Sequence, residues 1–218
     1  MTNGACGTTA DAVRVSSPFS SSANAFPPTI CGTLTGQHMY FETGDSGIAG
    51  ALTIAKGSGT GNRNYQIKVT YLTCDNLARA PAGCTQYFTG LSGNFQSYNF
   101  PGGQLLQAMN YNNCFRQEEG YCQLQVREAA STIPDTFQLS GTDETSETTC
   151  TTLSSIILTT PNVGTFCGGS LNPVAGNMIP AVVTSSPGTS FQVGLQTLTT
   201  DLSDLTGFNL DYNQVPCA

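Results

Sequence analysis

Residue types that many enzymes and nucleic-acid-binding proteins depend on are scarce in this 218-residue sequence. It contains no tryptophan and one histidine, His38, so a mechanism that needs two histidines in one chain is excluded. Only 10% of its residues are charged, against about a quarter in an average soluble protein. Because the exposed faces of helices usually carry Glu, Lys and Arg, this scarcity favours strands and turns.

Basic residues are absent from the later part of the chain. All seven Lys and Arg lie in residues 1–127 together with six acids, whereas residues 128–218 carry eight acids and no basic residue. Nucleic acid is therefore not expected as a partner, since phosphate contacts need Lys and Arg. The acidic half also argues against docking on anionic lipid, and no apolar run is long enough to cross a membrane.

The sequence has nine cysteines, none of them in a Cys-x-x-Cys pair. Their wide spacing in a strand-rich chain is typical of disulfide bonds formed in an oxidising compartment, which predicts a secreted, extracellular protein. The N-terminus lacks the apolar stretch of a signal peptide, so we expect the numbering to begin within a longer precursor or Met1 to be an addition.

Short segments with strand-like patterns predict an all-β chain. Some alternate polar and apolar residues, as half-buried strands do, and others are continuous apolar runs, typical of strands buried on both faces. Turn signals such as Pro101-Gly102-Gly103 separate them. The alternating segments are 12–15, 66–72, 123–127 and 208–212, and the continuous runs are 155–158 and 181–183.

An internal repeat relates residues 6–74 to residues 150–217. Cys31-Gly32 in the first copy echoes Cys167-Gly168 in the second. In each copy an earlier cysteine precedes a strand, and a later alternating strand leads to a closing cysteine. Nothing before the first copy corresponds to residues 84–149, so the sequence predicts one complete unit and the C-terminal half of another.

Residues 84–101 resemble the opening of a CUB domain, with a cysteine, a glycine nine residues later and then a turn. Residues 113–116 are similar to the second cysteine and its strand, and Gly207-Phe208 with Tyr212 to the close of the domain. Segments such as 116–122 resemble secreted arthropod CUB proteins. The resemblance implies a jelly-roll-like sandwich of two antiparallel sheets.

Together, the resemblance and the repeat predict an all-β protein of CUB-like sandwiches, one complete and one a C-terminal half. The half would span residues 1–74, a linker residues 75–83, and the complete domain residues 84–218. A half sandwich leaves strand edges unpaired and one core face uncovered, so we do not expect it to stand alone. Either a preceding segment covers it, or it packs against another surface.

The resemblance and the repeat also imply four disulfide bonds and one odd thiol, Cys74. The CUB pattern implies the bonds Cys84–Cys114 and Cys150–Cys167. The remaining cysteines of that unit give the bond Cys122–Cys217, and the repeat gives the bond Cys6–Cys31. A second map pairs neighbours, Cys74–Cys84 and Cys114–Cys122, and leaves Cys217 odd. Loop length distinguishes the maps only weakly, so both stay open.

Many CUB domains bind calcium through three acids, and the resemblance implies where these would lie. In the complete unit the first position falls at Ser140, the second among residues 153–155, which contain no acid, and the third at Asp201. Calcium needs about six to eight oxygen ligands, several of them charged. Asp11 matches the second position in the half unit, without an acid at the third. We interpret Asp201 and Asp11 as remnants of a calcium pattern and expect no metal site and no cofactor.

Residues that could carry catalysis lack suitable partners. His38, expected on a strand, is interpreted as a partly buried histidine bonded to the backbone, because no Gly-x-Ser-x-Gly elbow accompanies it. Glu118 and Glu119 are adjacent, and adjacent acids in a strand or hairpin point to opposite sides, unlike the paired acids of a glycosidase. We therefore expect no enzymatic activity.

The sequence thus predicts a secreted, non-enzymatic CUB protein that binds an extracellular protein or associates with itself. One alternative is the non-catalytic part of a CUB-bearing protease precursor. Another is a carrier of a small apolar ligand or an extracellular structural protein.

Overall fold

The computed structural model describes residues 4–16, 27–44, 49–130, 135–141, 144–200 and 202–217. In these residues the regular structure consists of short strands and one 3-10 turn, η2 (Phe100–Gly102). The predicted all-β class is confirmed. No helix in the described ranges has the length and apolarity of a membrane span.

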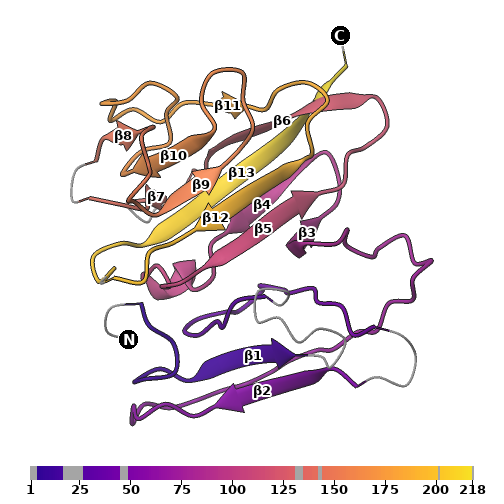
Figure 1. The fold of residues 1–218 in the computed structure, drawn as a ribbon, viewed down its shortest axis with the longest axis vertical. Coiled ribbons are helices and arrows are strands. Elements are labelled where there is room, and N and C mark those ends of the chain that lie inside the picture. Colours follow the sequence, from indigo (N-terminus) through magenta and orange to yellow (C-terminus); the bar gives the residue numbers. More distant parts are fainter. Residues whose placement is uncertain are drawn as a thin grey trace.

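Two sheets pack face to face in residues 84–217 (Figure 1). One sheet has the order β3-β5-β12-β9-β10-β8, and the other has the path β11-β6-β13-β4 with β7 paired to β13. The strands of the first sheet are β3 (Cys84–Phe88), β5 (Asn110–Phe115), β12 (Gln192–Gln196), β9 (Ser155–Ile157), β10 (Thr165–Gly168) and β8 (Ser146–Glu147). Those of the second are β11 (Val183–Thr184), β6 (Tyr121–Glu128), β13 (Gly207–Pro216), β4 (Ser92–Gln96) and β7 (Phe137–Gln138).

One strand pair departs from the expected antiparallel arrangement. β3 pairs with β5 in parallel, whereas the other pairings in the described sheets are antiparallel. The chain leaves β3, crosses to the opposite sheet as β4 and returns to β5, and such a crossover brings two strands into the same direction.

Alternating apolar residues build the core between the sheets. On β13, Phe208, Leu210 and Tyr212 face inward and are buried. The ring of Tyr212 lies 4.5 Å from that of Phe115, which in turn lies 5.0 Å from that of Phe95. Aromatic rings at these separations pack edge-to-face or tilted, so the core has specific geometry as well as apolar area.

The first part of the chain forms a separate two-stranded sheet, β1 (Ala12–Ser16) with β2 (Ala51–Ala55). The strand expected at 66–72 is wrong, since these residues belong to no strand and pair with none of the described strands. The strand expected around His38 is also absent. The run 181–183 contributes only one residue to the short edge strand β11, and Val182 is exposed instead of buried on both faces.

Residues 33–40, here called the strap, connect the first part to the sandwich. The Thr33 amide donates to Oδ1 of Asn99 at 2.7 Å, and the Gln37 side chain donates to the Ser97 carbonyl at 2.9 Å. The Tyr40 amide donates to a carbonyl of β3 at 2.8 Å. The strap therefore runs from the turn after β4 to the β3 edge of the sandwich.

Candidate functional site

Four disulfide bonds join cysteines that are distant in the sequence. They are Cys6–Cys31, Cys84–Cys114, Cys122–Cys217 and Cys150–Cys167. These are the pairs that the resemblance and the repeat imply, and the neighbour map is not formed. Cys74 is exposed and bonded to no other cysteine of the described residues.

His38 in the strap is held by the backbone. The Tyr87 amide donates to its Nε2 at 3.0 Å, and the Tyr98 hydroxyl donates to its carbonyl at 2.9 Å. Burial lowers the pKa of His38, since the charged imidazolium loses water there. Because the Nε2 lone pair is already used by an amide, this nitrogen is not available as a general base.

The serines at two expected calcium positions are buried and serve the backbone. Ser140 accepts a hydrogen bond from the Gly168 amide at 2.7 Å, and Ser154 accepts one from the Leu198 amide at 3.1 Å. Asp201 lies outside the described residues. Within those residues, no three His, Cys, Asp or Glu side chains come together as metal ligands would.

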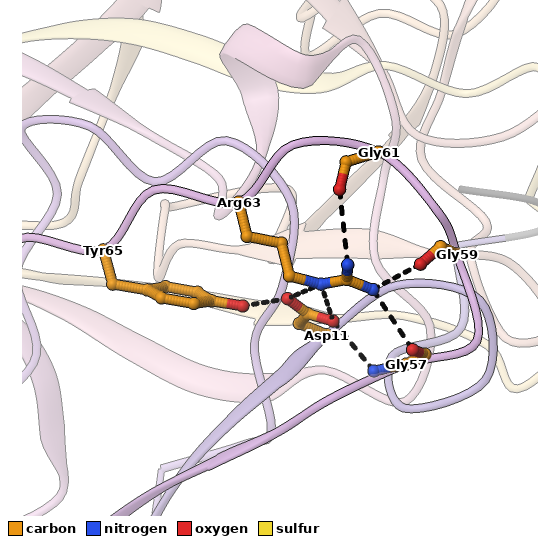
Figure 2. Close-up of polar contacts among 6 residues, drawn as sticks. All are labelled: Asp11, Gly57, Gly59, Gly61, Arg63 and Tyr65. Atoms are coloured by element: carbon orange, nitrogen blue, oxygen red, sulfur yellow. Dashed lines mark hydrogen bonds and ion pairs between the residues drawn. The ribbon is translucent and has the colours of Figure 1, made fainter.

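Asp11, the other expected remnant, forms an ion pair with Arg63 (Figure 2). The Arg63 Nε lies 2.8 Å from Oδ2 of Asp11, and the Gly57 amide donates to Oδ1 at 2.8 Å. The Tyr65 hydroxyl donates to the same carboxylate. The hydrogen bonds from Arg63 are the largest cause of a lowered Asp11 pKa.

The same guanidinium also closes the loop that follows β2. Its two terminal nitrogens donate to the carbonyls of Gly57, Gly59 and Gly61 (Figure 2). One carboxylate and three carbonyls thus surround a side-chain cation. This is an oxygen-rich surrounding of the kind that a metal ion would use, and it is already filled by the protein's own positive charge.

The loop between β10 and β11 presents apolar side chains to solvent. Four of them, exposed between 52% and 75%, are Val174, Met178, Ile179 and Val182. The loop is nevertheless fixed. Ser146 donates to the Val174 carbonyl at 2.7 Å, and Asn172 donates through its side chain to the Ile179 carbonyl at 2.9 Å. We call residues 172–182 the apolar loop. Fixed, exposed apolar residues are typical of an interaction site.

Next to the apolar loop, the outer side of the five-stranded sheet carries a groove of about 620 Å³. Val182 lines it together with polar residues of β4, β6 and β13. Arg127 lies 3.6 Å from Asp211 in this groove, and the arginine side chain is largely exposed. A polar groove beside apolar residues has the composition of an interface rim next to its core.

The apolar loop was not predicted from the sequence. Met178-Ile179-Pro180 stands out within a segment rich in Gly and Asn, and this contrast is the signal that could have identified it. The loop has neither strand nor helix periodicity, so a search for alternating or helical spacing of apolar residues does not detect it.

Comparison with known proteins gives a match to one family model. The model of the animal CUB domain matches residues 81–215. No curated protein matches the chain.

Solved structures show distant similarity. The full extracellular region of zebrafish Gpr126/Adgrg6 has 16% identity and a TM-score of 0.42, covering 62% of this chain and 15% of that one. The CUB1-EGF-CUB2 domains of human MASP-1/3 have 16% identity and a TM-score of 0.36, covering 94% and 81%. Those of rat MASP-1 have 14% and 0.33, covering 93% and 80%. The chain therefore spans a small part of the zebrafish region.

Proposed function

Since the chain belongs to the animal CUB domain family, we propose that it is a secreted, non-enzymatic protein that binds another protein outside the cell through the apolar loop. The CUB domain is typically an extracellular protein-interaction module. Four disulfide bonds support the extracellular placement, because such bonds persist in oxidising compartments.

The apolar loop is the observation that carries the proposed binding role. Met178 and Ile179 are exposed although Ser146 and Asn172 fix the backbone on which they stand. A fixed loop loses little conformational freedom when a partner binds, so more of the contact energy remains as affinity. The apolar side chains of this loop and the polar groove beside it fit a protein partner better than a nucleic acid or a charged membrane.

The non-enzymatic part of the proposal is supported by two titratable side chains that are already engaged in hydrogen bonds. His38 is engaged through Nε2 by the Tyr87 amide. Glu118 accepts hydrogen bonds from Arg116 and from the Gly90 amide, and both lower its pKa. A general acid or base needs an atom that is free to exchange a proton with the substrate and a pKa near the operating pH.

Photo-crosslinking at methionine tests the binding role. The chain has four methionines, of which Met178 is 60% exposed and Met109 is 3% exposed. In cells of the source organism fed with photo-methionine, we expect irradiation of the medium to join the protein to a partner through Met178. The Met178→Leu variant serves as the control and should lose this adduct. Equal adducts from both proteins, or absence of the protein from the medium, would contradict the proposal.

A further inference from the structure

Four apolar residues at alternate positions lie exposed between β2 and Cys74. Their exposed fractions run from 46% to 84%. These residues, here called the 65–71 stripe, are Tyr65, Ile67, Val69 and Tyr71. Such alternation is the pattern of a strand that covers a core, yet the four residues belong to no strand of the described sheets, and the hydroxyl of Tyr65 reaches only Asp11, just before β1.

The two copies of the repeat have the same pairing register where both are present. In the first copy, Val13 of β1 pairs with Ile54 of β2. In the second, Ile156 of β9 pairs with Leu195 of β12. A hydrogen bond from the loop that follows each strand pair agrees as well. The amide three residues after Ile54 donates to the carboxylate of Asp11, and the amide three residues after Leu195 donates to the hydroxyl of Ser154. The structure of the second copy is therefore a guide to what the first copy lacks.

The stripe has buried counterparts in the second copy. Its first three residues lie at the same distances before their closing cysteine as three residues of β13 do. These counterparts are Phe208, Leu210 and Tyr212, which are between 0% and 4% exposed. In the sheet, β13 lies between β6 and β4 (Figure 1). Both neighbours belong to residues 84–149, and no described strand of the first copy takes their place beside the stripe.

The closing cysteines differ in the same way. Cys217 at the end of β13 is bonded to Cys122 of β6. Cys74, at the equivalent position, is exposed and has no bonded cysteine in the described part of the chain. Its partner would lie on the absent counterpart of β6.

We propose that the 65–71 stripe and Cys74 form an interface for the N-terminal half of a CUB sandwich, supplied by polypeptide outside these 218 residues. The occupant places one strand on each side of residues 65–73 and a cysteine against Cys74. A second copy of this chain is a poor occupant, because its β4 and β6 are already paired with its own β13. This surface is separate from the apolar loop, so the inference does not rest on the proposed function.

The link at Cys74 is an oxidation of two thiols to one disulfide bond. The two electrons and two protons pass to an oxidised dithiol or to glutathione disulfide of the secretory pathway, the class of oxidant that forms extracellular disulfides in general. The occupant thereby becomes joined as Cys122 is joined to Cys217.

Peptide mapping of the native protein tests the proposal. The protein is captured with an antibody against residues 84–217, its free thiols are blocked, and it is digested without reduction. We expect the Cys74 peptide in a mixed disulfide with a peptide of an alternating strand from a CUB N-terminal half. We also expect slow hydrogen exchange at residues 65–73 in native material and fast exchange in the recombinant 218-residue chain. A blocked thiol at Cys74, a Cys74–Cys74 link, or fast exchange in both materials would overturn the proposal.

Matched variants distinguish an apolar interface from a chance disulfide. Neighbouring residues of a strand face opposite sides, so Val69 belongs to the stripe and Thr70 does not. When tagged protein is expressed in the source organism, Val69→Lys should reduce the Cys74-linked form at least about tenfold, whereas Thr70→Lys should not. Equal effects of both changes would contradict an apolar interface. The binding of a partner at the apolar loop should be unaffected by either variant.

Discussion

Arg63 binds both carboxylate oxygens of Asp11, with its Nε 2.9 Å from Oδ1 and 2.8 Å from Oδ2 (Figure 2). The same guanidinium reaches the carbonyls of Gly57 and Gly59. A fixed side-chain cation thus occupies the place where the sequence suggested a remnant of a metal site. The 52-residue separation of the two side chains hides this pairing from sequence patterns.

Arg63→Ala should raise the pKa of Asp11, because its hydrogen bonds are the largest cause of the lowered value. A carboxyl with a lowered folded pKa contributes stability above its unfolded pKa, and this contribution is lost as pH falls through the folded pKa. The variant should therefore show a weaker acid dependence of unfolding. NMR titration of the Asp11 carboxyl measures the change, and Arg14→Ala, at an exposed position of β1, is the control. An unchanged Asp11 titration in Arg63→Ala would refute this assignment.

Mild acid should lower the free energy of unfolding of the protein through His38 in the strap. The folded pKa of His38 lies below its ordinary value of 6.5 because the ring is buried. Between these two values the unfolded chain binds a proton that the folded chain does not, so the free energy of unfolding decreases as pH falls through this window. Above about 6.5 the contribution is complete, and below the folded pKa it is lost.

Denaturant unfolding at several pH values measures this effect. Since the chain has one histidine, His38→Gln removes the only imidazole and should flatten the profile in the window. Parallel profiles for the two proteins would show that His38 does not carry the dependence.

Chelation with EDTA should leave the melting temperature unchanged. Ser140 and Ser154 are buried and already accept backbone amides, so two carboxylate ligands of the expected calcium set are replaced. A bound ion at a concentration about 100 times its Kd would add about 2.7 kcal/mol, which thermal unfolding detects easily. A drop of several degrees in EDTA would show that a metal site exists after all.

The bond Cys122–Cys217 should contribute more to stability than Cys150–Cys167. It closes a loop with a sequence separation of 95, against 17 for the other. Chain-entropy estimates are about 4.7 kcal/mol for a loop of about 100 residues and about 3 kcal/mol for about 15 residues. Paired Cys→Ser variants unfolded in urea give the comparison, and a larger loss from the shorter loop would contradict the expectation.

Local pattern predicts a strand only where its neighbours are present. Residues 208–212 and 66–72 have similar alternation, and the first lies in β13 whereas the second is in no strand. The difference is tertiary, since β4 and β6 flank β13, whereas no strand of the described ranges pairs with 66–72. Cysteine spacing and the repeat were more informative, because the implied pairs are the ones that the structure forms.

Other features depend on contacts that no local pattern encodes. The parallel pairing of β3 with β5 follows from a crossover through the opposite sheet. The apolar loop is fixed by Ser146, which lies 28 residues before Val174. Its four apolar side chains are each more than half exposed, so they do not follow the buried-face periodicity on which strand and helix prediction depends.

The most direct test of the binding role is a comparison of affinities for the protein that crosslinks at Met178. Ile179 is 75% exposed in the apolar loop, and Leu77 is 90% exposed outside it. Calorimetry should show that Ile179→Asp weakens binding at least about tenfold, or about 1.4 kcal/mol, as for an apolar residue at an interface centre. Leu77→Asp should bind like the unaltered protein. Unchanged affinity in Ile179→Asp, or an equal loss in both variants, would contradict the account.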